Sequence, residues 1–319
     1  MDSRITVEDF LKHQQPRRKV QGIAAALLPY QSDGRIAVDA FAQQLFSTHQ
    51  AGLMNAVNMD TGYVNYLTDA EKQNVLDWTR QALGPGVPFI AGAYIENQAG
   101  DDIAALYRQQ IEAIVQCGGI PILFQTSRLH GAPPESLIAI YRDTVRGYPD
   151  VLAFELGPVF AGNGQIHDLE TIRRLMDIPE IKGMKHSSLD RLAERKRLAL
   201  RDAHRPSFRI YSGNDLGINM TEYGSDYLLG LAGFAPEKFA ERDRLWHAGN
   251  PDYYALADAL QHLGNVAFRA PVRAYKHSAA VFLNLIGRIP SSRTHPLNPR
   301  RPSWEPEILR DCARRLSLP

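Results

Sequence analysis

Residues 181–190 read IKGMKHSSLD, a short apolar run that carries two lysines and passes into a polar, serine-rich turn. The apolar and small residues predict a buried strand, and the serines are typical of a turn that opens a helix. Side chains alternate between the two faces of a strand, so Lys182 and Lys185, an odd number of positions apart, point in opposite directions. Only one of the two lysines can therefore face a given pocket.

A lysine at the carboxyl end of a buried strand can act as a nucleophile. Burial lowers the pKa of the amine and leaves a neutral form that attacks a carbonyl to give a Schiff base. The alternative is an ordinary lysine whose stem lies along apolar surface while its ammonium reaches solvent. The rest of the chain has to decide between these two interpretations.

Similar strands occur on both sides of this stretch. Strands are predicted over residues 22–30, 52–58, 87–94, 120–125, 151–156, 181–186, 208–212 and 227–231. Amphipathic helices are predicted between them over residues 37–51, 68–82, 99–117, 134–145 and 168–176. Strands that alternate with helices indicate parallel βαβ units, and eight of them favour a closed (β/α)8 TIM barrel of the α/β class over an open sheet.

The barrel predicts a division of the chain into three parts. These are an N-terminal segment, 1–20, with one helix over 7–14, the barrel, 21–235, and a C-terminal helical region, 236–319, that ends in a proline-rich tail at 290–306. The first strand is not followed by G-x-G-x-x-G, and no P-loop occurs, so a nucleotide site has no support.

Composition excludes several classes of function. The 319 residues are 44% apolar and 22% charged, with a net charge of +1, which does not fit a nucleic-acid-binding protein. The basic clusters at 17–19, 195–197 and 300–301 are interpreted as solvated surface. No apolar run approaches the ~20 residues of a membrane span, and the polar start is not a secretory signal. With only Cys117 and Cys312 and no metal or redox motif, we expect a cytoplasmic protein without membrane or nucleic-acid partners.

The active sites of such barrels lie at the carboxyl ends of the strands. Lys185 is near that end of its strand and Lys182 is near the other end, so Lys185 is the candidate nucleophile. Other chemically active side chains fall at the same ends of other strands. They are Asp60, Thr61, Tyr94, Gln125, Thr126, Glu155, His186, Ser187 and Asn214.

Several motifs, in this order along the chain, match a known family. They are GIAAALLPY at 22–30, Thr61-Gly62 before Leu67-Thr68, VPFIAG at 87–92, IKGMKHSS at 181–188 and YSGND at 211–215. With them the chain resembles the dihydrodipicolinate synthase and N-acetylneuraminate lyase family from Gly22 to about Arg288. The lysine strand is the most specific element of the resemblance.

The resemblance implies a class I aldolase-type lyase that is a homo-oligomer, tetramer or dimer, and needs no metal or organic cofactor. Lys185 would form an imine with a small oxo substrate, typically pyruvate. The protonated imine is an electron sink, so a carbon–carbon bond can break or form beside it. The expected substrate-binding residues are Asp60, Thr61, Gly62, Tyr94, Phe154, Ser187, Gly213 and Asn214.

The chain departs from the family at Asp60. The family's carboxylate-binding turn, glycine-threonine-threonine-glycine-glutamate, reads MDTGY here at 59–63. An ionised Asp60 would repel a substrate carboxylate by ~4 kcal/mol at about 4 Å and an effective dielectric of about 20. Either Asp60 turns away, as a loop or helix-cap aspartate would, or the substrate is not an ordinary 2-oxo acid.

A second departure lies at the end of the fifth strand, where the family has a proton-transferring tyrosine. Alignment on the strand puts Phe154 at that position, and alignment on Pro158 puts Glu155 there. A slip of one residue in the alignment changes which side chain faces the barrel interior. We predict that Glu155 faces inward, since an unpaired carboxylate against the apolar helix layer would be costly. Glu155 would then be the general acid or base, with its pKa raised by burial. The alternative is a structural carboxylate that accepts hydrogen bonds from loop N–H groups.

The loop at 159–167 lacks the arginine with which synthases of the family hold a second carboxylate, so dihydrodipicolinate synthesis itself is not expected. Tyr94 and His186 are reserve acid or base candidates. We therefore predict a Schiff-base lyase, aldolase or dehydratase that acts on a small oxo acid or sugar-acid-like carbonyl compound. The alternatives are a non-catalytic binder on the same barrel and a metal-dependent enzyme using Asp60, Glu155 and His186.

Overall fold

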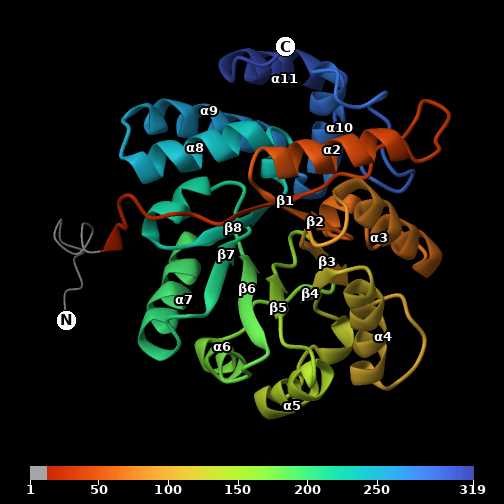
Figure 1. The fold of residues 1–319 in the computed structure, drawn as a ribbon, viewed down its shortest axis with the longest axis vertical. Helices are drawn as coiled ribbons and strands as arrows, with labels where there is room; N and C mark the ends of the chain where they lie inside the picture. Colours follow the sequence, from red (N-terminus) through yellow and green to blue (C-terminus); the bar gives the residue numbers. More distant parts are fainter. Residues whose placement is uncertain (1–12) are drawn as a thin grey trace.

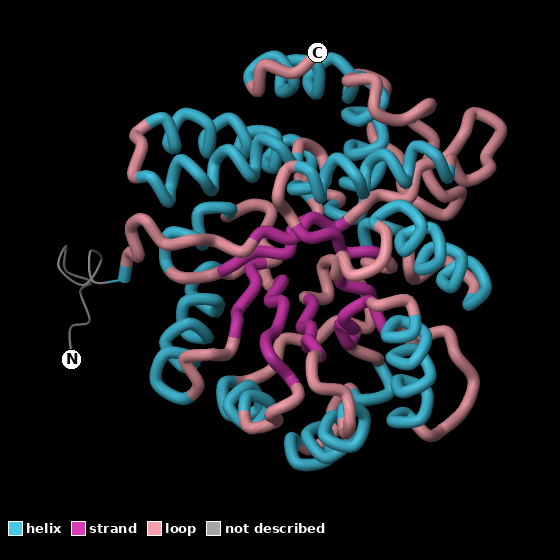
Figure 2. Tube along the Cα trace, in the orientation of Figure 1, coloured by secondary structure: helices cyan, strands magenta, loops and turns pink. Residues whose placement is uncertain are grey.

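The computed structural model describes residues 13–319, so the helix predicted over residues 7–14 lies almost wholly outside the described residues. Eight strands close into a barrel in the order β1 to β8, and every neighbouring pair is parallel. Helices surround the ring of strands, as Figure 1 and Figure 2 show. The predicted (β/α)8 fold is confirmed.

Each predicted strand is present, and most are shorter than predicted. The strands are β1 (Gly22–Ala25), β2 (Met54–Val57), β3 (Phe89–Ala93), β4 (Gly119–Leu123), β5 (Val151–Leu156), β6 (Ile181–Ser187), β7 (Arg209–Ser212) and β8 (Asp226–Leu229). They are short because a βα unit needs few residues to cross the barrel before its loop begins. The strand that carries the two lysines, β6, is the longest of them.

Four of the outer helices, α3, α4, α6 and α7, begin at a capping side chain. Thr68 and Glu71 form a reciprocal capping box at α3, and the Asp190 carboxylate accepts two backbone N–H groups at the start of α7. The helices of the outer layer are α2 (Val38–Gln50), α3 (Asp69–Leu83), α4 (Ile103–Gln116), α5 (Pro134–Val145), α6 (Leu169–Met176), α7 (Arg191–His204) and α8 (Pro236–Ala248).

The C-terminal region is helical, as predicted, and consists of α9 (Asp252–Ala267), α10 (Tyr275–Leu285) and α11 (Glu305–Arg315) after α8. The chain ends in α11 and not in the proline-rich tail that we predicted, because the prolines only lead into that helix. Helices α8 and α9 run side by side next to α2 (Figure 1). None of the helices in residues 13–319 has the length and apolarity needed to cross a lipid bilayer.

Side-chain alternation divides the core into two layers. Leu152, Phe154 and Leu156 of β5 belong to the apolar cluster inside the barrel. Val151 and Ala153 of the same strand belong to the cluster between the strands and the helices. The face of each residue in β5 and β6 is thereby fixed, and with it the set of side chains that can reach the barrel mouth.

Candidate active site

Lys185 lies in the second half of β6 with its side chain inside the barrel. The residue is buried, and its Nζ lies 4.6 Å from the centre of the Phe154 ring on the neighbouring strand. Burial lowers the pKa of the amine to about 8, against the opposing charges of Asp215 and Asp60. Lys182 is exposed near the other end of the strand, where its Nζ donates to the Pro179 carbonyl at 2.8 Å. The two lysines point in opposite directions, as alternation predicts.

Gly213 provides the space that the Lys185 side chain occupies. A Cβ built on Gly213 would stand 2.7 Å from Lys185 Cε and 1.9 Å from Ser187 Oγ, both closer than real Cβ contacts. Ser187, two residues after Lys185 and on the same face, is 1% exposed. Its hydroxyl has no hydrogen-bond partner among the described residues. A buried hydroxyl without a partner beside a buried amine is well placed to bind a polar ligand atom.

We expect Gly213→Ala to displace the Lys185 side chain, because neither neighbouring atom can be accommodated at these distances. The rate of imine formation on Lys185 should fall by at least about tenfold while the fold is kept. The measurement is the yield of borohydride-trapped adduct on the folded variant. An unchanged yield would contradict the tight packing described here. Gly162→Ala is a suitable control, since no atom lies within 4 Å of a Cβ built there.

Glu155 does not face the barrel interior, and the prediction that it does is wrong. Phe154 is the residue that faces inward, against Lys185. Glu155 points toward the helix layer, where Arg197 of α7 binds both of its carboxylate oxygens. The carboxylate is therefore not unpaired there, which removes the reason for expecting it inside. Arg197 itself is 3% exposed, so the interpretation of the 195–197 cluster as solvated surface is also wrong at that residue.

The pKa of Glu155 also moves opposite to the prediction. Burial alone would raise it, but hydrogen bonds and charges from His186 and Arg197 hold it below its usual value. His186 Nδ1 lies 2.5 Å from Glu155 Oε1, and His186 Nε2 lies 2.6 Å from the Ser188 hydroxyl. The backbone N–H of His167 donates to Glu155 Oε2 at 3.0 Å. Glu155 and His186 thus form a buried ionic network between β5, β6 and α7, away from Lys185.

Asp60, at the end of β2, is paired by side chains from the C-terminal region. Lys276 Nζ donates to Asp60 Oδ1 at 2.9 Å, and the Tyr275 hydroxyl donates to Asp60 Oδ2 at 3.0 Å. The Thr61 hydroxyl lies 2.8 Å from the same Tyr275 oxygen. The charge of Asp60 is therefore compensated within the protein, which answers the repulsion considered from the sequence. Sequence reasoning missed both Tyr275 and Lys276.

The remaining predicted residues differ in what they can offer a ligand. Burial raises the pKa of Tyr94 to about 12, and its ring packs on Phe124, which in turn packs on Phe154. Asn214 uses its side-chain oxygen to accept the N–H of Leu216 within its own loop. Gly62 N–H donates to Met59 O at the start of the loop after β2, at 2.9 Å. The rings of Tyr94 and Phe154 thus belong to one aromatic cluster, while Asn214 and Gly62 form hydrogen bonds within their own loops.

Asp215 is a buried carboxylate that the sequence motif contained and the prediction did not use. It accepts the N–H of Leu231 at 2.8 Å. Burial raises its pKa to about 7, an effect that this hydrogen bond and the charge of Lys185 oppose. A carboxylate and an amine whose pKa values approach each other in one buried space can share a proton near neutral pH.

The three residues of the metal hypothesis do not come together. Asp60 is bound by Lys276 at the barrel mouth, whereas Glu155 and His186 lie between the strands and α7. Within residues 13–319 there is no group of three or more His, Cys, Asp or Glu side chains placed to hold a metal ion. The geometry therefore gives this hypothesis no support.

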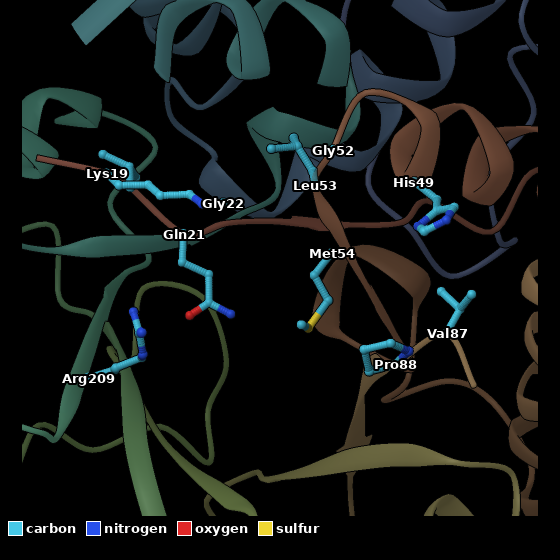
Figure 3. Close-up of a pocket in the computed structure, with 11 residues that line it drawn as sticks. Lys19, Gln21, Gly22, His49, Gly52, Leu53, Met54, Val87, Pro88 and Arg209 are labelled. Atoms are coloured by element: carbon cyan, nitrogen blue, oxygen red, sulfur yellow. The ribbon is translucent and has the colours of Figure 1, made fainter. Parts of the chain in front are cut away.

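A hollow of about 630 Å³ lies at the opposite end of the barrel, at the amino ends of β1, β2, β3 and β7. Figure 3 shows Gln21 and Arg209 on one side of it and Pro88 across from them, with Met54 between. Arg209 is engaged there by Asp226 at 2.6 Å. This hollow does not contain Lys185 or any other residue predicted for the site.

Two sequence relatives match part of the chain. A 4-hydroxy-tetrahydrodipicolinate synthase from Thermosynechococcus vestitus is 28% identical over 201 residues, which cover 60% of this chain and 62% of the relative. The match thus spans less than two thirds of that enzyme's length. A second enzyme of the same name, from Kosmotoga olearia, is 24% identical over 224 residues, 69% of this chain and 74% of the relative. No protein-family model matches the chain.

Solved structures of the same family superpose over nearly the whole chain. Dihydrodipicolinate synthase from Thermotoga maritima gives a TM-score of 0.78 at 18% identity, covering 95% of this chain and 100% of the other. A prophage protein of the dihydrodipicolinic acid synthase family from E. coli, solved in complex with pyruvate, gives 0.80 at 17% identity, covering 94% and 99%. This chain is similar to dihydrodipicolinate synthases in part of its sequence and in its whole fold.

The resemblance predicted from the motifs is therefore confirmed. At 17–18% sequence identity, the superposition on solved structures shows the fold alone. The lysine motif that carried the resemblance forms β6 of the barrel. The chain departs from the family's motifs at Asp60, which pairs with Lys276, and at Phe154, which faces Lys185. One signal for Lys276 was available in the sequence, since it stands as a lone charge among the buried residues of α10.

Proposed function

We propose that the protein is a class I aldolase-type lyase in which Lys185 forms an imine with a small oxo acid or sugar-acid-like carbonyl compound. The observation that carries the proposal is the buried Lys185 amine inside the barrel, with a pKa lowered to about 8. At neutral pH a useful fraction of such an amine is neutral and can attack a carbonyl carbon. The reaction needs no metal, because the protonated imine itself accepts the electron pair of the bond that breaks.

The surroundings of the amine support the same chemistry. The unpartnered Ser187 hydroxyl can bind the carbonyl oxygen or a neighbouring hydroxyl of the substrate. The Phe154 ring shields the amine on one side, and an aromatic face also favours the cationic iminium that forms. The loop at 159–167 contains no arginine, so synthesis of dihydrodipicolinate is not part of the proposal. A homo-oligomer, tetramer or dimer, stays a prediction from the resemblance.

Borohydride trapping tests the function directly. The protein is incubated with pyruvate, hydroxypyruvate, 2-oxobutyrate and a sugar-derived 2-oxo-3-deoxy acid, each followed by borohydride, and digested for mass spectrometry. We expect a covalent adduct on the peptide that contains Lys185 with at least one compound. Absence of an adduct with every compound, from protein that is folded, would overturn the proposal.

The rate of trapping should depend on pH in a defined direction. Only the neutral amine attacks, and its fraction rises as pH increases toward the Lys185 pKa of about 8. We therefore expect the initial rate to rise by about tenfold per pH unit below that value and to level off above it. An ordinary exposed lysine would keep rising to about pH 10. Initial rates between pH 6 and pH 10 distinguish the two profiles.

A further inference from the structure

Four side chains at the barrel mouth form a continuous hydrogen-bonded chain. Asp60 and Thr61 come from the loop after β2, and Tyr275 and Lys276 come from the first turn of α10. The contacts run from the Thr61 hydroxyl to the Tyr275 hydroxyl, 2.8 Å, and from there to Asp60 Oδ2, 3.0 Å. Lys276 Nζ holds the other Asp60 oxygen at 2.9 Å.

Charge fixes the direction of these hydrogen bonds. Asp60 forms a salt bridge with Lys276, so Tyr275 donates to the carboxylate and cannot accept from it. The phenol has one proton, which is then used, and Thr61 must donate to the phenol oxygen. The Thr61 oxygen is the free end of the chain, ready to accept a proton from outside it. Burial and the Asp60 charge raise the pKa of Tyr275 well above its usual value, so the phenol keeps a proton at all times.

The chain lies at the carboxyl end of the barrel, the end toward which Lys185 stands on its strand. Asp215 and Asp60 are the two carboxylates whose charges act on that amine. The same two carboxylates act on the Tyr275 phenol. Gly230, at the end of β8, lies against both Thr61 and Tyr275, since a Cβ there would stand 3.2 Å from Thr61 Oγ1 and 3.1 Å from the Tyr275 ring. The amine and the chain thus border the same end of the barrel.

Imine chemistry requires proton transfer as well as an amine, and the side chain packed on Lys185 cannot supply it. Phe154 has no exchangeable proton, and Glu155 is held by Arg197 on the other side of its strand. We propose that Thr61, Tyr275 and Asp60 form the proton relay of the site, with Lys276 holding Asp60 in position. This inference rests on the proposed imine function and names the groups that complete it.

The relay can support the cleavage of a carbon–carbon bond in the substrate, with the destination of every proton and electron pair defined. The substrate is held as an iminium on Lys185 and carries a hydroxyl two carbons from the iminium carbon. The hydroxyl proton moves to Thr61 as Thr61 passes its own to Tyr275 and Tyr275 passes its own to Asp60. The oxygen's electron pair becomes the carbonyl bond of the released aldehyde, and the pair of the broken carbon–carbon bond converts the iminium to an enamine.

The return of the proton completes the cycle. The proton on Asp60 travels back through Tyr275 and Thr61 to the enamine carbon, which restores the iminium. Water then hydrolyses the iminium, releasing the ketone and the free Lys185 amine. Thr61 touches the substrate in this sequence, while Tyr275 and Lys276 act through their neighbours as relay and positioning residues.

The test separates imine formation from proton transfer by using Tyr275→Phe, which removes only the phenol oxygen. Pyruvate in deuterated water reports both steps: borohydride trapping measures the adduct on Lys185, and NMR measures deuterium entry into the methyl group through the enamine. We expect the variant to keep the adduct within about twofold and to lose at least about 100-fold in exchange rate. Tyr253→Phe, which also removes a buried phenol–carboxylate hydrogen bond (3.0 Å to Glu222), should change neither readout.

Wild-type exchange in Tyr275→Phe would overturn the relay and leave the imine function standing. Equal loss of adduct and exchange would also overturn it, because Tyr275 would then serve the attack of Lys185 and not the later proton transfer. Failure of the wild-type protein to form any adduct would overturn the relay and the proposed function together. If Tyr275→Phe does not fold, Thr61→Val removes the free end of the relay and carries the same expectations.

Discussion

Replacing Lys185 with methionine should abolish trapping by borohydride and lower turnover by at least about 10³-fold, because the variant lacks the amine that forms the imine. Methionine is close in length, so the space beside Gly213 and Phe154 stays filled. The buried position also favours an apolar side chain over an ammonium, and the variant should be at least as stable as the wild type. Turnover of the compound identified by trapping and the adduct mass are the measurements.

Lys182→Met is the matched control within the same strand. That ammonium is exposed and donates to the Pro179 carbonyl, so adduct and turnover should stay near wild-type values. A Lys185→Met protein that retains both activity and adduct would show that another amine carries the reaction. If the wild type shows no turnover and the Lys185→Met protein binds the carbonyl compound as well as the wild type does, the protein is a non-catalytic binder.

Replacing Arg197 with methionine should lower the free energy of unfolding by about 3 to 5 kcal/mol, the cost of leaving a buried carboxylate without its cation. Glu155 is 1% exposed, and Arg197 is the arginine that binds both of its oxygens. His186 remains beside Glu155 but cannot replace the bidentate contact. Urea denaturation followed by circular dichroism gives the free energy.

Two further variants define the origin of that loss. Glu155→Gln combined with Arg197→Met should recover most of the stability, because the pair is then removed as a unit. Arg173→Met, which breaks an exposed ion pair with Glu170, should leave the denaturation curve where it is. If Arg197→Met denatures like Arg173→Met, the buried network does not stabilise the fold in the way described here.

The strands and the face of Lys185 could be predicted because they depend on local pattern. Apolar runs bounded by turn residues locate the barrel strands, and alternation alone separates Lys185 from Lys182. The prediction for Glu155 failed because the cost of burying its carboxylate against the helix layer was judged from the residues of its own strand alone. Its cation, Arg197, comes from α7, in a cluster whose composition is that of a solvated surface.

Long-range pairing also explains the residues that were missed at the barrel mouth. Asp60 is an unusual charge for its motif, but the motif alone does not determine the orientation of its side chain. Its partner Lys276 is 216 positions away, and nothing in a local window connects them. The family resemblance located the helical region that contains Lys276 but gave no role to it, since the resemblance transfers only positions that match a known motif.

The ion pair between Asp60 and Lys276 joins the loop after the second strand of the barrel to the region beyond the eighth strand. A truncated chain ending at residue 235 would keep the nucleophilic strand and lose the counter-charge of the mouth, leaving a carboxylate beside the amine. A chimera that takes its barrel from this protein and its last helices from a relative would meet the same mismatch unless lysine were carried across. The chemistry of the barrel mouth therefore depends on residues that follow the last strand of the barrel.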